Sequence, residues 1–423
     1  MKEKLADNRK QLLIFCIMAV ALFCRFFYLG NIPGDEALHA DEAYAGYQAW
    51  SMLHYGIDSE GYHNPVYFVA WGSGMNALES YCMIPFIALF GLSSLGIRAA
   101  SAVLGIITVY VFYRLLKEGA NDEIALIGAA FIAIVPWHVM ISRWGLESNF
   151  LPGFLLISIY FFTKALENSK YAILSMLFFG LSLYAYSATW VVMPVLLLTL
   201  GIYFMKTGQL RIDIWWICGF ILLVLMAIPL LLFVAVNMDL ISPISTNIIS
   251  IPKLTVFRGE DVSLSPKVMI DNIRAMMRVV VDQEDDWLWN NMPATGIYYR
   301  ISGIFIILGI AASIYGAVVN KFRNQNVIMI IWFVAAIILG TLISGNINRI
   351  NIIHIPVIYF CVYGIYSFIG FFKNEPRLIV KLGIGLAYIV SFVYFFSYYC
   401  TKFDDNFAAR FSDGIKDAIE YAL

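Results

Sequence analysis

Long apolar segments recur along almost the whole chain, and short polar connections separate most of them. Each segment is close to the ~20 residues that a helix needs to cross a bilayer. Eleven of them are predicted to span, at about 11–29, 97–116, 123–140, 149–166, 171–189, 190–205, 214–234, 301–320, 327–344, 351–372 and 379–399. The pattern therefore predicts an all-α integral membrane protein, a polytopic bundle of about 11 transmembrane helices.

Two long segments, residues 30–96 and 235–300, interrupt this alternation. In the first, apolar residues recur at the i, i+4, i+7 and i+10 spacing of one helix face, in a stretch too short and too polar to span. This stripe consists of Ala43, Tyr47, Trp50 and Leu53. We expect the helix that carries it to lie on the membrane surface.

Three further segments within these loops show helical or aromatic patterns. Residues 65–91 are apolar and aromatic but are broken at Gly72-Ser73-Gly74, which predicts interfacial or re-entrant helices. Residues 266–281 predict an amphipathic helix, and residues 282–289 combine acidic side chains with tryptophan. That last composition is common on sugar-binding surfaces, and it is also typical of solvated loops and interfacial aromatic belts.

Composition supports a single membrane domain over residues 1–423. Hydrophobic residues make up 61% of the chain and charged residues only 13%, whereas a soluble domain has about 25% charged residues. No stretch is long and polar enough for a second domain of ordinary size. The six cysteines are scattered without the spacing of a zinc site or a disulfide framework.

Basic residues orient the predicted spans. Lys2, Lys4, Arg9 and Lys10 precede the first span, and the other basic residues on the same side are Arg114, Lys117, Lys164, Lys170, Lys206, Arg211, Lys321, Arg323, Lys373, Arg377 and Lys381. The positive-inside rule then predicts a cytoplasmic N-terminus, with both long loops and the C-terminus external. The first span is full-length, contains Arg25 and is predicted to be an uncleaved anchor.

Acidic pairs in the first external segment are the clearest candidates for chemistry. Asp41 and Glu42 open the predicted surface helix, and Asp35 and Glu36 form a second pair just upstream. On spacing alone, Asp41 is either a functional carboxylate or the helix N-cap. Glu147, in a short external turn, is either a site residue or the partner of Arg143 in an i,i+4 pair.

Several motifs together carry a resemblance to a known superfamily. They are Arg25-Phe26-Phe27-Tyr28-Leu29-Gly30, the Asp41-Glu42 pair, Gly56-Ile57-Asp58, Gly61-Tyr62-His63-Asn64-Pro65, Phe90-Gly91-Leu92-Ser93-Ser94-Leu95-Gly96-Ile97-Arg98 and Ser142-Arg143-Trp144-Gly145-Leu146-Glu147-Ser148-Asn149. In these the chain resembles the GT-C membrane glycosyltransferases, in the group of protein O-mannosyltransferases and lipid A aminoarabinose transferases (glycosyltransferase family 39-like). The resemblance covers the first half well and the second half more loosely.

The resemblance implies a GT-C-type helical bundle and an inverting transfer of one monosaccharide. The donor would be a polyprenyl-phosphate sugar, and the acceptor a lipid, glycan, wall polymer or protein on the external face of the cytoplasmic membrane. A phosphate is already a good leaving group, so the chemistry needs one base and cations for the departing phosphate. Asp41 is the expected base, with Glu42 orienting the acceptor or a partner side chain and Glu147 as a second active-site acid.

Cations and polar residues at external positions are expected to contact the polyprenyl-phosphate sugar that serves as the glycosyl donor. Arg349, among asparagines at the mouth of a span, is the first phosphate candidate, and Arg300 and Arg143 are others. Snorkelling to the interface is the alternative explanation for Arg300, and equally for Arg25 and Arg98. His63, Asn64 and Tyr44 are expected to line the donor or acceptor pocket.

We expect no cofactor and no metal, although His39, Asp41 and Glu42 could supply ligands. No nucleic-acid partner is expected. An O-antigen-type polymerase or ligase is the alternative enzyme, but such enzymes usually place their site in a late loop. A lipid or glycan transporter is the non-enzymatic alternative, and it should show charges or broken helices near the middle of the membrane.

Overall fold

The computed structural model describes residues 2–34, 37–257, 262–285, 287 and 290–408. Asp35 and Glu36, together with Asp286, Leu288 and Trp289 of the acidic and tryptophan-rich loop, lie outside the described residues. The interpretations attached to these positions therefore stay predictions.

The described residues form a helical membrane protein, as the sequence predicts. Seven helices are long and apolar enough to span: α4 (Ser94–Gly119), α7 (Glu147–Glu167), α9 (Thr189–Lys206), α10 (Ile214–Asn237), α13 (Arg323–Leu342), the helical run Asn351–Gly370 that contains α14 (His354–Gly370), and the run Asn374–Asp405 that begins with α15 (Asn374–Tyr399). Three shorter apolar helices are α3 (Leu78–Phe90), α8 (Tyr171–Ala185) and α12 (Ser302–Val318). The remaining α-helices are α1 (Lys2–Phe26), α2 (Ala40–Tyr55), α5 (Asp122–Ile134), α6 (Pro136–Ile141), α11 (Pro266–Met277) and α16 (Lys402–Ala408). Every predicted span contains helix, and the count of eleven spans stays a prediction.

The chain falls into two compact units. Unit 1 contains residues up to 27, residues 105–140 and residues 270–401, and unit 2 contains residues 28–104, residues 141–269 and the segment from residue 402. The long segment 30–96 and the start of α7 therefore belong to unit 2, whereas the loop that carries Arg349 belongs to unit 1.

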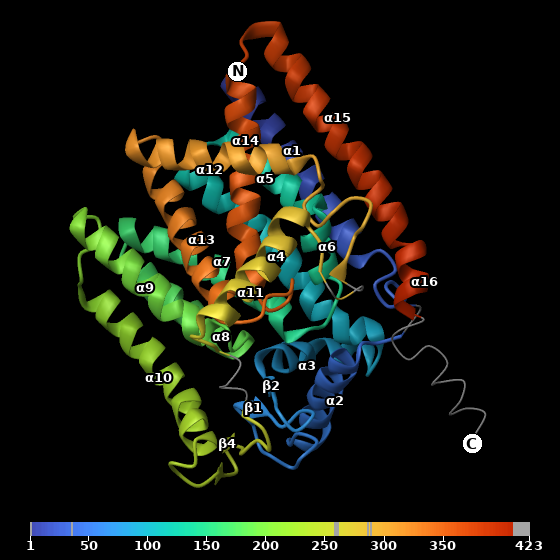
Figure 1. Ribbon diagram of the computed structural model, residues 1–423, viewed down its shortest axis with the longest axis vertical. Coiled ribbons are helices and arrows are strands. Elements are labelled where there is room, and N and C mark those ends of the chain that lie inside the picture. The colour runs from blue at the N-terminus through green and yellow to red at the C-terminus, as the bar shows by residue number, and fades with distance from the viewer. Residues whose placement is uncertain (1, 35–36, 258–261, 286, 288–289, 409–423) are drawn as a thin grey trace. The chain divides into compact units, whose positions relative to one another are not determined.

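In unit 1, helices α12 and α14 lie side by side, which glycines allow (Figure 1). A Cβ atom on Gly309 would lie 1.7 Å from the Phe360 carbonyl oxygen, and one on Gly364 would lie 1.9 Å from the Phe305 carbonyl oxygen. The two backbones thus touch at positions that no larger residue could occupy. Small residues at such contacts are characteristic of helix packing in membranes, where dispersion replaces the hydrophobic effect.

The polar ends of several unit 1 helices are joined by ion pairs. Lys10 of α1 contacts Asp122 at the start of α5, at 2.5 Å. Arg377 and Lys381 of α15 contact Glu123 at 2.8 and 3.0 Å. These ends carry basic residues that the positive-inside rule assigns to one side, and the structure brings them together. Which side of the membrane they face stays a prediction.

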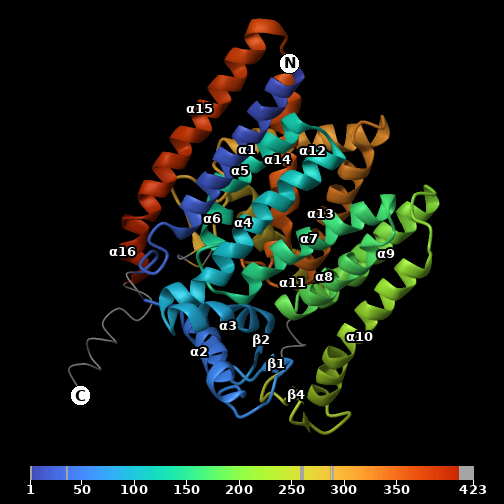
Figure 2. The ribbon, with the colours of Figure 1, turned by 180° about the vertical axis from the view of Figure 1, so that it is seen from behind.

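In unit 2, α8 packs against both α7 and α10, and α2 packs on α3 (Figure 2). Between α2 and α3, strands β1 (Tyr67–Phe68) and β2 (Met75–Asn76) form an antiparallel hairpin. The prediction that residues 65–91 form helices is therefore right for α3 and wrong for residues 67–76, and the interfacial position of α3 stays a prediction. Gly72 and Gly74 have φ angles of +75° and +138°, so the glycines turn a hairpin rather than separate two helices.

The second long segment also contains a short hairpin and a helix. Strands β3 (Ile244–Ser245) and β4 (Ser250–Ile251) pair within unit 2, and the Val66 amide donates to the Ser250 carbonyl at 3.1 Å. Helix α11 begins at Pro266, as the amphipathic pattern predicts, and a π-helical turn, Arg278–Asp282, follows it.

Candidate functional site

His39 caps the helix that carries the acidic pair. Its Nδ1 atom accepts the Asp41 amide at 3.1 Å, while the His39 amide donates to Glu42 Oε2 at 3.1 Å, which forms a capping box. Burial lowers the pKa of His39, against smaller opposing effects of Asp41 and Glu42. A neutral imidazole with an unprotonated Nδ1 is the state this cap requires. The N-cap is therefore His39, and the alternative that Asp41 itself is the cap is wrong.

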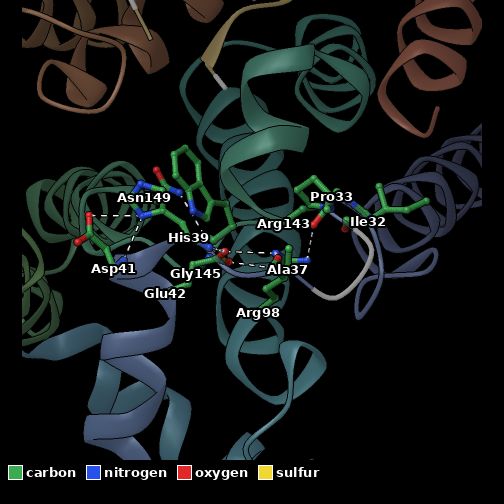
Figure 3. A network of polar contacts seen from close by, with 12 residues as sticks. Ile32, Pro33, Ala37, His39, Asp41, Glu42, Arg98, Arg143, Gly145 and Asn149 are labelled. Atoms are coloured by element: carbon green, nitrogen blue, oxygen red, sulfur yellow. Dashed lines mark hydrogen bonds and ion pairs between the residues drawn. The ribbon is translucent and has the colours of Figure 1, made fainter. Parts of the chain in front are cut away.

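Glu42 lies in a fully buried ion pair with Arg98 (Figure 3). The Arg98 Nε atom donates to Glu42 Oε1 at 3.0 Å and its Nη2 atom to Oε2 at 3.2 Å. Arg98 also donates to the carbonyl oxygens of Pro33 and Ala37 at 3.0 and 2.9 Å. The snorkelling explanation for Arg98 is wrong, because this side chain has no exposed surface.

Glu42 also holds the turn that precedes α7. The Gly145 amide donates to Glu42 Oε1 at 2.9 Å. Each of the two carboxylate oxygens therefore accepts two hydrogen bonds (Figure 3). In the same turn, buried Arg143 donates to the Ile32 carbonyl at 2.9 Å, and Asn149 donates to the Trp144 carbonyl at 3.1 Å. Glu42 is thus a positioning group that joins α2, α4 and this turn.

Asp41 is in a different environment from its neighbour. Its side chain is 34% exposed, its Oδ1 atom accepts the Trp71 indole N–H at 3.2 Å, and its Oδ2 atom lies 3.5 Å from His39 Nδ1. It lies in the first turn of α2, where the helix dipole favours an ionised carboxylate. A carboxylate that is open to solvent and lies beside an indole can accept a proton from a bound hydroxyl group.

Glu147, at the start of α7, lies against β2. It accepts hydrogen bonds from both the backbone amide and the side-chain amide of Asn76. Glu79, in the first turn of α3, is 1% exposed, and neither of its carboxylate oxygens accepts a hydrogen bond from the described residues. Burial raises the pKa of Glu79 well above its usual value, and Glu147 raises it further, followed by Glu42 and Asp41. Three other carboxyl groups of unit 2 therefore oppose the ionisation of Glu79.

The predicted pocket residues of unit 2 are held by backbone contacts. The Tyr44 hydroxyl donates to the Val69 carbonyl at 2.7 Å, and burial raises the pKa of Tyr44 to about 12. Its ring lies 5.9 Å from that of Trp71. His63 Nδ1 contacts the Gly56 carbonyl at 3.1 Å, and exposed Asn64 donates to the Ile248 carbonyl at 3.0 Å. Tyr44 thus lies near Asp41 through Trp71, whereas His63 and Asn64 fix the loops.

The other predicted cations belong to unit 1. Arg300 is exposed and contacts Glu284 at 3.2 Å and the Pro293 carbonyl at 3.0 Å, so its charge is already paired. Half-buried Arg349 lies in a loop that Asp285 holds, because the Ile347 amide donates to Asp285 at 2.8 Å. The Arg349 amide donates to Asn346 Oδ1 at 2.7 Å. This loop presents Arg349 from a fixed backbone.

Within the described residues, no group of three or more His, Cys, Asp or Glu side chains could hold a metal ion. The sequence pattern did not reveal that Arg98 pairs with Glu42 or that Trp71 donates to Asp41. It also did not reveal that Glu79 is buried near other acids. Arg98 has a signal in retrospect, since a lone arginine early in an apolar helix requires a buried partner. A glutamate beside the apolar run of α3 gives a similar signal.

Comparison with known proteins confirms the resemblance at the level of the fold. Residues 78–233 match the model of the family described as dolichyl-phosphate-mannose-protein mannosyltransferase. No curated protein sequence matches the chain. Solved structures of membrane glycosyltransferases, described next, share the fold of this chain at low sequence identity.

The oligosaccharyltransferase of Archaeoglobus fulgidus, in its apo form, is 14% identical with a TM-score of 0.60, over 92% of this chain and 56% of that chain. The same organism's oligosaccharyltransferase AglB, in complex with an inhibitory peptide and a dolichol-phosphate, is 12% identical with a TM-score of 0.58, over 95% and 56%. ArnT from Cupriavidus metallidurans, bound to undecaprenyl phosphate, is 15% identical with a TM-score of 0.55, over 89% and 63%. The chain thus spans a little more than half the length of the proteins it resembles.

The Glu42–Arg98 pair predicts a strong dependence of stability on Arg98. Arg98→Ala should lower the free energy of unfolding by about 3–5 kcal/mol, because it leaves a buried carboxylate without a counter-charge. Thermal or denaturant unfolding of the detergent-purified protein measures this. The matched control is Arg114→Ala on the same helix, whose partner Glu118 is partly exposed and whose loss should cost less than about 1 kcal/mol. Equal effects of the two substitutions would contradict the assignment.

Proposed function

We propose that this chain is an inverting glycosyltransferase that moves a monosaccharide from a polyprenyl-phosphate donor to an acceptor hydroxyl group. The observation that carries the proposal is the contrast between two adjacent carboxylates. Glu42 is buried and neutralised by Arg98, whereas Asp41 is one-third exposed and accepts the Trp71 indole N–H. An ion pair that is already complete leaves Asp41 as the carboxylate available to substrate.

The reaction proposed for Asp41 is a single displacement. The acceptor oxygen forms a bond to the anomeric carbon, the bond from that carbon to the phosphate oxygen breaks, and Asp41 takes the acceptor proton. The phosphate leaves with the bonding electron pair, so no general acid is required. Attack from the side opposite the leaving group inverts the anomeric centre.

Cations are required where the phosphate departs. Arg349 is the proposed donor contact, because its planar guanidinium can bind two phosphate oxygens and its loop is fixed by Asp285. The proposal of a lipid-linked donor draws support from the two similar structures that contain undecaprenyl phosphate and a dolichol-phosphate.

The proposed orientation places the chemistry outside the cell. Basic residues of α1 and α15 pair with the start of α5. The positive-inside rule assigns these helix ends to the cytoplasmic side. The segment with Asp41 and the loop with Arg349 then lie on the external face, where lipid-linked sugars meet wall polymers, glycans, lipids or proteins.

Substitution of the proposed base tests this function. Asp41→Asn should fold and bind donor but lose at least ~10²-fold in rate, the usual scale of base catalysis. The cap survives, because it depends on His39 and on the Asp41 backbone amide. Lipid-linked sugars that accumulate in a deletion strain, identified by mass spectrometry, supply the donor for the assay. Asp35→Asn is the control and should cost much less, and the opposite ranking would transfer the role to Asp35.

Chelation tests the proposal that transfer needs no metal. Purified protein treated with a strong chelator should keep its transfer rate, since the proposed step uses a carboxylate base and arginine. A loss of activity that Mg²⁺ or Mn²⁺ restores would instead make Asp41 and its acidic neighbours metal ligands.

Arg349 variants distinguish phosphate binding from membrane anchoring. Arg349→Lys keeps the charge but loses the planar fork, so donor affinity and rate should both fall, whereas an anchor would tolerate lysine. Arg349→Ala should weaken binding of undecaprenyl phosphate by about 1.5–3 kcal/mol, the scale of hydrogen bonds to charged groups. Binding to folded protein in detergent measures this. Unchanged donor affinity in both variants would exclude the role.

A further inference from the structure

Glu79 is the acidic group that the proposed reaction leaves unexplained. It lies in the first turn of α3, is 1% exposed, and neither carboxylate oxygen accepts a hydrogen bond from a described residue. An ionised carboxylate in such a place would be a buried charge without a counter-charge or a donor, which is a costly arrangement. The carboxyl group avoids this cost if it carries a proton.

The charged and titratable groups around Glu79 are mostly acidic. Helix α3 packs against α2, α7 and α8. Helix α2 contributes Asp41 and Glu42, α7 contributes Glu147, α3 itself carries Cys82, and the α8 sequence contains tyrosines but no charged residue. Arg98 of α4 is committed to Glu42. Glu79 therefore has acids as its ionisable neighbours on α2 and α7.

Glu147 is the neighbour to which a protonated Glu79 would donate a hydrogen bond. The Glu147 carboxylate is held by two donors from Asn76, three residues before Glu79 in the chain. The Asn76 Oδ1 atom is itself buried and accepts no hydrogen bond from the described residues. Among the acids around Glu79, Glu147 has the largest electrostatic effect on it. A neutral Glu79 can donate its hydroxyl group to this carboxylate, whereas an ionised Glu79 would repel it.

We propose that Glu79 and Glu147 hold one proton between them, with Glu79 as the protonated member, and that this neutral acid positions the Glu147 carboxylate. Two close carboxyl groups that share a proton titrate as a pair. The shared proton also makes the acidic site less negative by one charge, which favours the approach of a phosphate-linked donor. The role of Glu147 in catalysis rests on the function proposed above, but the shared proton does not.

Infrared spectroscopy tests the protonation directly. The difference spectrum of the unsubstituted protein minus Glu79→Gln, near neutral pH, should contain the C=O stretching band of a protonated carboxylic acid. Asp58→Asn is the matched control, because Asp58 is a second buried acid of unit 2, and its Oδ1 atom, unlike either oxygen of Glu79, accepts two backbone amides from the described residues. Its difference spectrum identifies any band that belongs to Asp58. Absence of the band assigned to Glu79 would overturn the proposal, whether or not the protein transfers sugar.

The pH dependence of stability gives a second test. A glutamate whose pKa is raised in the folded state binds more protons when folded than when unfolded, so stability falls as pH rises above about 4.3, the pKa in the unfolded chain. Glu79→Gln removes this loss. Its unfolding temperature relative to the unsubstituted protein should therefore rise between about pH 5 and about pH 8. A difference that does not change with pH would contradict a protonated Glu79.

Activity distinguishes positioning from simple packing. Glu79→Met keeps the shape but donates no hydrogen bond, so its kcat should be at least about 10-fold below that of Glu79→Gln, whose amide still donates. In a Glu147→Gln background, Glu79→Met should cost little more, because the group it positions has already changed. Equal rates for the Met and Gln variants, with both proteins folded, would reduce Glu79 to a spacer and overturn the positioning role.

Discussion

The buried ion pair of Glu42 and Arg98 is the constraint on which the acidic site depends. A charge without exposed surface is tolerated only when its partner and its hydrogen bonds are complete, and here both Glu42 oxygens and all three Arg98 nitrogens have partners. The pair therefore fixes the start of α2 against α4 and against the turn that carries Gly145. Because Asp41 precedes Glu42 in the same helical turn, its position is fixed by the same contacts.

Four carboxyl groups of unit 2 have four different environments. Asp41 is open to solvent, Glu42 is paired with a cation, Glu147 is held by amides, and Glu79 is buried without a donor among the described residues. Environment rather than residue type decides which acid stays ionised and which keeps its proton. The proposed base and the proposed proton carrier follow from this difference, and they require that water reach Asp41 but not Glu79.

Rigid surroundings hold the side chains of the proposed reaction in each unit. In unit 1, Gly309 and Gly364 let α12 and α14 touch through their backbones, and Asp285 holds the loop of Arg349. In unit 2, hairpin and helix contacts hold the described part of the segment 30–96, which would otherwise be a loop of more than 60 residues. Side chains placed by such contacts can meet a substrate without first being ordered.

The sequence by itself determined the membrane helices, the short helix that begins near Asp41 and the acidic pair within it. These features follow from local physics, since backbone groups in lipid must be paired within one helix, and caps act over three or four residues. It did not determine that His39 is the cap, that residues 67–76 form a hairpin, or that Arg98 neutralises Glu42 from 56 residues away. Only the tertiary structure decided which of two adjacent carboxylates is buried and which stays open, because burial depends on residues that are distant in sequence.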